Sequence, residues 1–271
     1  MRDARRIIGT HNILLLTLDT LRYDVAVELL DQGRLPNLAQ ALPDGRWERR
    51  HAPGSFTYAS HAAMLAGFLP TPATPGPHPR LFAAAFPGSE TTAPGTWVFD
   101  AANLPSGLAK AGYHTVCVGG VGFFNKLTPL GSALPSLFAE SHWEPAFGVT
   151  CATSFEEQLA RVEEVVPGRE EPVFLLLNVS ALHQPNWFYL PDGDPGAGDG
   201  RESHAAALEY VDRHVGRLFA LMAADRPCMT IVCSDHGTAY GESGYVGHRI
   251  GHEVVWTVPY GEFVIEKGEW A

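Results

Sequence analysis

The chain of 271 residues is long enough to bury a substantial core and short enough to form one α/β domain. Its 19 basic and 30 acidic residues give a formal net charge of −11, which would repel nucleic acid phosphates and anionic membrane surfaces. We therefore expect a single domain over residues 1–271 with no nucleic acid partner. An anionic substrate would have to be captured locally, by a metal ion or by some of the 12 histidines.

The N-terminal segment combines a basic start at 1–6 with an apolar run at 7–18. This arrangement is similar to a signal peptide, but His11 and Asn12 interrupt the run and no small-residue cleavage site follows. No other apolar stretch approaches the roughly 18 residues that cross a bilayer. The four cysteines lack a metal-finger spacing and are expected to be reduced thiols. The sequence thus predicts a first strand, no membrane span and a cytoplasmic location.

Strand-like and helix-like segments alternate along the chain. Short apolar runs predict strands at 12–18, 114–119, 173–179 and 229–234. Helical spacing or a closing glycine predicts helices at 60–66, 103–111 and 203–223. Stretches rich in proline and glycine predict loops at 70–79 and 191–200. The alternation is typical of an α/β three-layer sandwich, in which helices cover both faces of a mostly parallel central sheet.

Two of the predicted strands end in an acidic residue. Asp19 follows the first strand directly, and the strand at 229–234 leads into Asp235 and His236. Open α/β sheets bind ligands beyond the carboxyl ends of their strands, so these side chains could converge on one cation. Two carboxylates and an imidazole suit Mn²⁺, Mg²⁺, Ca²⁺ or Zn²⁺. The alternative is that each acid caps the turn or helix that follows it.

A third segment is a turn-rich approach to a helix start, in which Thr57 and Ser60 would lie near N–H groups that favour an anion. Together, Asn12 to Asp24 (NILLLTLDTLRYD), Thr57 to Gly67 (TYASHAAMLAG) and Ser234 to His248 (SDHGTAYGESGYVGH) resemble three signature segments in order and spacing. These are the signatures of sulfatase-like members of the alkaline phosphatase superfamily. The resemblance covers nearly the whole chain.

The resemblance implies that Asp19, Thr57, Asp235 and His236 bind one divalent metal ion. It also implies that Thr57 is the nucleophile, which forms a covalent ester with a phosphoryl or sulfuryl group. Sulfatases carry a Cys or Ser at this position that is oxidised to formylglycine, a change that threonine cannot undergo. Thr20 stands where sulfatases place a further acidic or amide ligand. This departure favours Mn²⁺ or Zn²⁺ over Ca²⁺ or Mg²⁺.

The resemblance also implies roles for three further histidines. His183 is expected to stabilise the leaving group or donate a proton to it, and His248 is expected to be a proton donor. His61 stands where sulfatases have an arginine, and it would support Thr57 or contact the transferred group. The alternatives are a turn histidine before Pro185 for His183 and an exposed first-turn histidine for His61.

Two more residues are candidates for substrate binding. Gly120 lies where sulfatases usually offer a lysine, and Asn125 with Lys126 in the following loop could replace that lysine. Solvated loop polarity is the alternative for this pair. His252 lies four residues after His248 and would share a face with it if the segment is helical.

The same two histidines could instead bind a second metal ion, as in the two-metal branch of the superfamily. That site would need an additional acid and histidine, and Asp199 and His204 are the nearby candidates. Their spacing differs from the usual four-residue step, so one metal ion is favoured.

The chain ends at Ala271, soon after the last motif, whereas most sulfatases continue with a C-terminal subdomain. We expect a minimal domain that lacks most of this subdomain, with a cleft that is open or is completed by a larger substrate or by a partner subunit, as in a homo-oligomer. Substrate loops are expected at 68–100 and 184–202.

The predicted function is a metal-dependent hydrolase or transferase that acts on a phosphate mono- or diester, of a small molecule or a conjugate, through a covalent Thr57 intermediate. The alternatives are a sulfate-ester hydrolase without formylglycine and a noncatalytic accessory protein that binds a metal or ligand.

Overall fold

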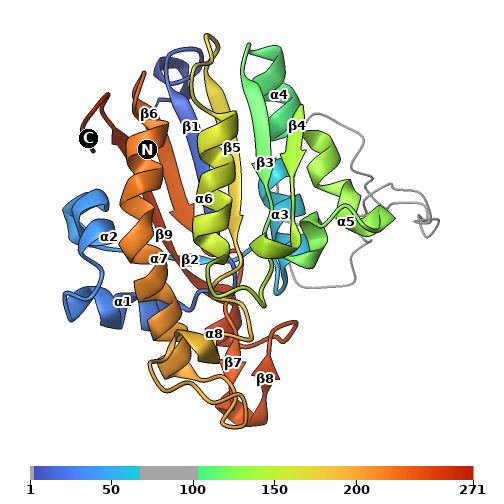
Figure 1. Cartoon of the computed structure of the whole chain (residues 1–271), viewed down its shortest axis with the longest axis vertical. Coiled ribbons are helices and arrows are strands. Elements are labelled where there is room, and N and C mark those ends of the chain that lie inside the picture. Colours follow the sequence, from blue (N-terminus) through green and yellow to red (C-terminus); the bar gives the residue numbers. More distant parts are fainter. Residues whose placement is uncertain (1–2, 68–102, 271) are drawn as a thin grey trace, which may run out of the picture.

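The computed structural model describes residues 3–67 and 103–270. A seven-stranded sheet lies at its centre, in the order β2-β9-β6-β1-β5-β3-β4 (Figure 1). Neighbouring strands from β6 to β4 are parallel, whereas β9 is antiparallel to both β6 and β2. The strands are β1 (Asn12–Leu18), β2 (Glu48–His51), β3 (His114–Val118), β4 (Glu140–His142), β5 (Val173–Val179), β6 (Cys228–Cys233) and β9 (Thr257–Ile265), and a separate ribbon pairs β7 (Ala239–Tyr240) with β8 (Val246–Gly247).

Helices cover both faces of the sheet, which gives the predicted three-layer α/β arrangement. The helices are α1 (Tyr23–Asp31), α2 (Pro36–Ala41), α3 (Thr57–Ala66), α4 (Leu104–Lys110), α5 (Pro129–Ala133), α6 (Ser154–Val165), α7 (Arg201–Met222) and α8 (Glu253–Trp256). Buried side chains of α1, α2, α6 and α7 form one core cluster, and those of α3 and α4 form a second on the opposite face (Figure 1). Of the helices in the described residues, none has the length and apolar character to cross a membrane.

The first strand shows why the sheet forms where the sequence predicts it. Leu14 and Leu16 pack into the core cluster on one face, and Leu15 packs into the cluster on the other. A parallel strand that is covered on both faces has no solvent side, and it is therefore apolar at successive positions rather than at alternate ones. The same reasoning explains β5, in which every residue is buried.

The predicted element boundaries agree with the structure to within a few residues, with three notable differences. The predicted helix at 60–66 begins at Thr57, three residues earlier than expected. Three strands of the sheet, β2, β4 and β9, were not predicted. The β2 sequence ERRH is charged and exposed, β4 has only three residues, and β9 contains Pro259 and Gly261. The loops predicted at 70–79 and 68–100 lie outside the described residues.

The register of the central strands places three strand ends at one edge of the sheet. Leu18 of β1 pairs with Val179 of β5, and Thr17 of β1 pairs with Cys233 of β6. The residues that follow these strands therefore leave the sheet side by side, at its carboxyl edge.

Candidate active site

Asp19, Asp235 and His236 meet at the carboxyl edge of the sheet. Asp19 follows β1, and Asp235 and His236 follow β6 after one intervening residue. One ligand atom from each residue lies within 4.8 Å of the others, and all three side chains are completely buried. The structure thus brings together the three residues that the acidic strand ends predicted.

Thr57 joins this cluster from the first turn of α3. Its Oγ1 lies 3.2 Å from Asp19 Oδ2 and 3.4 Å from His236 Nε2, and the residue is only 2% exposed. The early start of α3 is responsible for this placement, because it puts Thr57 in the first turn of the helix. The backbone N–H groups of that turn have no hydrogen-bond acceptor within the helix. These groups and the helix dipole favour negative charge at the Thr57 oxygen.

The carboxylates of the cluster leave two buried oxygens without a partner. Asp19 Oδ1 and Asp235 Oδ2 accept no hydrogen bond from any described residue. Burial of both groups, together with the charge of Asp19, raises the pKa of Asp235 well above its usual value. A buried carboxylate without a partner is costly, and a bound cation would remove this cost.

The tautomer of His236 suits the same cation. Its Nδ1 lies 2.9 Å from the carbonyl oxygen of Gly237, which can only accept, so Nδ1 carries the proton. The bare Nε2 lies 3.5 Å from Asp235 Oδ2 and 3.9 Å from Asp19 Oδ1. Burial lowers the pKa of His236, which favours the neutral imidazole that a metal requires. The residues present therefore fit a divalent metal ion.

Thr20 does not add an oxygen ligand to this set. Its Oγ1 donates to the carbonyl of Leu182 at 3.1 Å, and its backbone N–H donates to Asp235 Oδ1 at 3.3 Å. Thr20 therefore positions Asp235 through its backbone. Ca²⁺ prefers six or more oxygen ligands, whereas the donors here are two carboxylates, an imidazole and a hydroxyl, which suit Zn²⁺ or Mn²⁺ better.

A network of buried polar side chains contacts the carboxylates of Asp19 and Asp235. Asn178 of β5 donates through Nδ2 to Asp19 Oδ2 at 3.1 Å and lies 3.4 Å from Thr17 Oγ1. Thr17 Oγ1 lies 2.9 Å from His61 Nε2, and His61 Nδ1 lies 2.9 Å from the carbonyl oxygen of Thr57. Asn178 was missed in the sequence, although it is the one polar side chain in the buried run VFLLLNV. Its pairing opposite Thr17 became evident only with the strand register.

His61 is a member of this network, and the structure corrects the position expected for it. The residue is completely buried, and its Nδ1 lies 3.6 Å from Asp235 Oδ2. Burial lowers the pKa of His61 to about 4, so the ring is neutral near pH 7. Two expectations for His61 were therefore wrong, namely that it is an exposed histidine in the first helical turn and that it contacts the transferred group. The hydrogen bond to the Thr57 carbonyl agrees with the other expectation, support of Thr57.

His183 and His248 line a cavity of about 420 Å³ together with Thr57. The His248 ring lies 4.7 Å from the ring of His236 and 5.5 Å from that of His183, measured between centroids. His183 Nδ1 lies 2.6 Å from the Gln184 carbonyl, which leaves Nε2 as the other polar atom of the ring. Burial, with His236 and His183 nearby, lowers the pKa of His248 to about 4. His248 is therefore neutral near pH 7.

Arg249 lines the same cavity and was missed in the sequence. Its guanidinium lies 5.7 Å from the centroid of the Phe56 ring, and its backbone N–H donates to the Ser55 carbonyl at 2.8 Å. Its φ of +68° lies in the left-handed region that non-glycine residues seldom adopt. The sequence did contain a signal for this residue, because the cationic Arg249 directly follows His248 in the segment GHR.

Asn125 and His252 lie outside this cavity. Asn125 Oδ1 accepts from the Leu127 N–H at 2.9 Å, within its own loop, as the alternative reading expected. His252 is the N-cap of α8 and accepts from the Val254 N–H at 3.3 Å. Because α8 begins at Glu253, the segment from His248 to His252 is not helical, and the condition for a shared helical face is not met.

The structure explains the glycine found where sulfatases usually offer a lysine. A Cβ atom at Gly120 would lie 2.6 Å from the carbonyl oxygen of Asn178 and 2.8 Å from Ser180 Cβ. The Gly120 N–H instead donates to Asn178 Oδ1 at 3.3 Å. No side chain fits here unless the backbone moves.

Asp199 and His204, the candidates for a second metal ion, have structural partners. Asp199 Oδ1 accepts from the N–H groups of Asn186 and Trp187. His204 is completely buried, and its Nε2 accepts from the Arg22 N–H at 3.3 Å. Within residues 3–67 and 103–270, the one group of three acidic, histidine or cysteine side chains placed to share a metal ion is Asp19 with Asp235 and His236.

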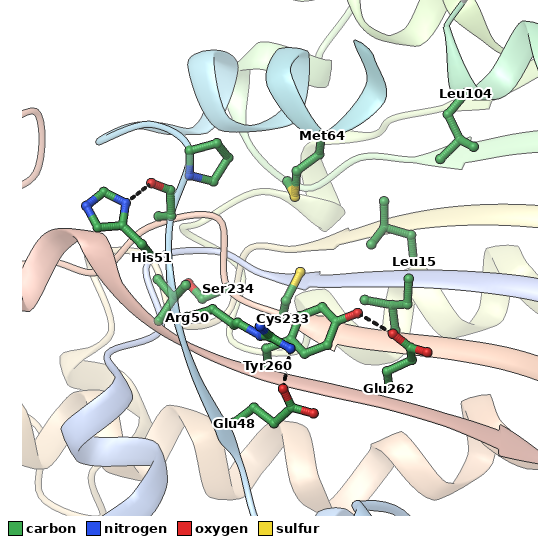
Figure 2. A pocket seen from close by; sticks show the side chains of 14 residues that line it. Leu15, Glu48, Arg50, His51, Met64, Leu104, Cys233, Ser234, Tyr260 and Glu262 are labelled. Atoms are coloured by element: carbon green, nitrogen blue, oxygen red, sulfur yellow. Dashed lines mark hydrogen bonds and ion pairs between the residues drawn. The ribbon is translucent and has the colours of Figure 1, made fainter. Parts of the chain in front are cut away.

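A larger cavity of about 900 Å³ lies on another part of the molecule (Figure 2). Leu15, Met64 and Leu104 supply part of its apolar wall, and its charged and phenolic groups pair with one another. Arg50 forms an ion pair with Glu48, and the Tyr260 hydroxyl donates to Glu262 at 2.8 Å. None of the three clustered ligands lines this space, so the smaller cavity at Thr57 is the candidate active site.

Comparisons with known proteins give the family and the fold of the chain. Residues 11–260 match the family model Sulfatase. A search of curated proteins gave no significant match.

Three solved structures, two of them named as phosphoethanolamine transferases, share the fold at low sequence identity. The soluble domain of lipooligosaccharide phosphoethanolamine transferase A from Neisseria meningitidis has a TM-score of 0.65 and 14% identity, over 96% of this chain and 78% of that one. The C-terminal periplasmic domain of EptC from Campylobacter jejuni has a TM-score of 0.63 and 14% identity, over 94% and 80%. The corresponding domain from Escherichia coli, in complex with Zn, has a TM-score of 0.61 and 13% identity, over 97% and 74%.

Proposed function

The chain belongs to the sulfatase family, and we propose that it is a metal-dependent hydrolase or transferase acting on a phosphate mono- or diester through a covalent Thr57 intermediate. The observation that carries this proposal is the position of Thr57 Oγ1 at the start of α3. It lies 3.2 Å from Asp19 and 3.4 Å from His236, beside two buried carboxylate oxygens that have no protein partner. Structures of similar fold that are named as phosphoethanolamine transferases support a phosphate ester rather than a sulfate ester.

Asp19, Thr57, Asp235 and His236 would hold the metal ion. Their donor set supports Zn²⁺ or Mn²⁺, and the similar Escherichia coli domain was solved with Zn. When bound, a divalent cation acts as a Lewis acid that lowers the pKa of a hydroxyl and polarises an oxygen of the ester.

The proposed reaction has two steps, both centred on Thr57. In the first, Thr57 Oγ1 gives its proton to solvent and forms a bond to phosphorus, while the bond from phosphorus to the leaving oxygen breaks and that oxygen takes up a proton. In the second, an oxygen of water or of an acceptor alcohol attacks the same phosphorus, the bond from phosphorus to Thr57 Oγ1 breaks, and the proton of the attacking group is released while Thr57 Oγ1 takes one up. Water makes the protein a hydrolase, and an alcohol makes it a transferase.

The two cavity histidines are assigned different roles. His183 in its imidazolium form stabilises the leaving oxygen or donates a proton to it through Nε2, because its Nδ1–H is held by the Gln184 carbonyl and Nε2 remains for the substrate. The low pKa of His248 argues against the proton donation expected from the sequence. We assign it a hydrogen bond from a neutral N–H to a nonbridging oxygen of the phosphoryl group.

Replacement of the nucleophile tests this proposal. Metal-loaded protein is assayed with aryl phosphate mono- and diesters, phosphonate esters and aryl sulfates. Thr57→Ala should lower the rate on the preferred ester at least roughly 1000-fold, because it removes the attacking oxygen. Thr57→Ser retains the hydroxyl and should keep measurable activity. Mass spectrometry of quenched wild-type reactions should find a phosphorylated Thr57, and an alanine variant that turns over at the wild-type rate would rule out this nucleophile.

The location of the protein is a separate proposal. The sequence favours the cytoplasm, whereas the similar Campylobacter jejuni structure is a periplasmic domain. Fractionation of the native protein in its source cells distinguishes the two compartments.

A further inference from the structure

The cavity beside Thr57 has two chemically different ends. Thr57, His183, His248 and Arg249 form a polar end that suits an oxyanion. The remaining wall is mostly apolar or without a side chain and consists of Val121, Gly122, Phe123, Thr128, Leu130, Gly131 and Val149. A volume of about 420 Å³ exceeds what a phosphoryl group alone fills. The cavity therefore has room for a second part of the substrate.

The fold holds the apolar wall in place through aromatic packing. The ring of Phe123 lies 6.1 Å from that of Phe56 and 5.7 Å from that of Tyr58, measured between centroids. Phe56 and Tyr58 flank Thr57 in the sequence, so these aromatic contacts join the wall to the segment that carries the proposed nucleophile. Aromatic pairs at this distance add to the stability gained from burial.

Hydrogen bonds fix the rest of the wall. The Val121 N–H donates to Asn178 Oδ1 at 3.2 Å, which ties the wall to the side chain that also binds Asp19. In the apolar wall, Thr128 Oγ1 accepts from the Gly131 N–H at 3.0 Å and caps α5. That hydroxyl is the one polar side chain among the described residues of this wall. Substrate hydroxyls placed against the wall would find few hydrogen-bond partners in the protein.

We propose that the substrate is a phosphate ester with an apolar aryl or alkyl group on one oxygen. The phosphoryl group lies against Thr57 and Arg249, and the apolar group packs on Phe123 and Leu130. This inference rests on the proposed function and adds the class of substrate. A sugar or another polyhydroxylated alcohol suits the wall poorly, because the wall gives it apolar contacts and little hydrogen bonding.

A series of diesters with one constant leaving group tests the inference. Methyl, butyl, octyl and phenyl 4-nitrophenyl phosphate all release 4-nitrophenolate, so differences in kcat/KM report on the other group. With metal-loaded protein, kcat/KM should rise about tenfold from methyl to butyl or phenyl, since burial of apolar surface is favourable. A larger gain for phenyl assigns an aryl group, and a gain that continues from butyl to octyl assigns an alkyl chain.

Variants of the wall locate the effect. Phe123→Ala should lower the phenyl-to-methyl ratio of kcat/KM about fivefold, because it removes the principal apolar surface. Leu127→Ala is the matched control, since Leu127 lies on the same loop, is 72% exposed and does not line the cavity. It should leave the ratio and the rates unchanged. A ratio near one in the wild type, with turnover intact, would overturn the inference and leave the proposed function standing.

Binding of phosphonates separates the two proposals further, because it needs no turnover. By calorimetry on the metal-loaded protein, phenylphosphonate or butylphosphonate should bind about tenfold more tightly than methylphosphonate. Equal affinities would overturn the inference. The expected preference in a protein that turns over no ester, with either water or an added alcohol as acceptor, would support the apolar wall and count against the proposed function.

Discussion

The ligand cluster and the cavity wall lie side by side but are held by the fold in different ways. Asp19, Asp235 and His236 are completely buried and follow central strands of the sheet. The wall, which consists of Val121, Gly122, Phe123, Thr128, Leu130, Gly131 and Val149, comes from short helices and loops, and most of it is partly exposed. Strand ends have little freedom to move, whereas loops tolerate changes of sequence and length. We therefore expect the cluster to determine the reaction and the wall to determine the preference among substrates.

This difference can be tested by mutation. A change in the cluster should alter metal binding and should affect all esters alike. A change in the wall should leave the metal ion in place and should alter affinity or preference for the ester. Any variant that breaks this separation identifies a residue that couples the two regions.

The largest effect is expected at Asp235. Asp235→Asn removes one of the charges that would hold the cation and places an amide in a site built for a carboxylate, so metal affinity should fall about 1000-fold. Competition with a chelator measures the affinity, and metal analysis of the purified protein measures occupancy. A variant that keeps a full complement of tightly bound metal would contradict the assignment.

The same variant should have the opposite effect on the metal-free protein. Because burial and Asp19 raise the pKa of Asp235, the charged form is unfavourable when no cation is present. A neutral Asn removes the repulsion between the two carboxylates. The metal-free variant should therefore unfold at a higher temperature than the metal-free wild type, which differential scanning calorimetry measures.

A smaller effect is expected at Asn178, which contacts both regions. Its Nδ2 donates to Asp19, and its Oδ1 accepts from the N–H groups of Gly120 and Val121. Asn178→Ala should lower metal affinity about 10- to 100-fold, as is usual when the hydrogen-bond partner of a ligand is lost. Asn125→Ala is a matched control, because that side chain bonds within its own loop, and it should leave metal affinity unchanged.

The contrast between Asn178 and Asp19 also shows what the sequence could predict. Asp19 and Asp235 were found because each interrupts a run of apolar residues at a strand end, which is a local pattern. Asn178 lies inside such a run, and its role depends on strand register and on the position of Asp19, which no local pattern contains.

His61 shows a second kind of limit. The helix that carries it begins three residues earlier than predicted, and this shift turns an apparent first-turn side chain into a buried one. The antiparallel strand β9 was missed for a related reason, since its proline and glycine are unfavourable in an isolated strand, whereas Pro259 is accommodated opposite Arg49 of β2 and Gly261 opposite Val232 of β6. The burial of His61 depends on a helix boundary, and the formation of β9 depends on pairing with distant strands. Neither is evident in short windows of sequence.

At Arg249, on the polar end of the cavity, the expected effect is a uniform loss of affinity. Arg249→Ala should lower kcat/KM about tenfold, and by the same factor for the methyl and phenyl diesters, because a charged hydrogen bond to the phosphoryl oxygens is common to both. Arg249→Lys keeps the charge and should recover part of the loss. A fall that differs between the two esters would mean that Arg249 contacts the apolar group instead.

An effect on stability, with none on metal or ester binding, is expected at His204, which belongs to neither region and tests burial alone. His204 is completely buried, and burial lowers its pKa to about 3, below the value near 6.5 of an unfolded chain. Unfolding therefore takes up a proton between these values, so the stabilising contribution is full above about pH 6.5 and is lost as the pH falls toward 3. One such group contributes up to about 1.4 kcal/mol per pH unit to the slope of unfolding free energy against pH. His204→Gln should reduce the slope of the metal-free protein by about this amount in urea titrations between pH 7 and pH 4.5, with His214→Gln on the same helix as the control. An unchanged slope would mean that His204 is already protonated in the folded protein.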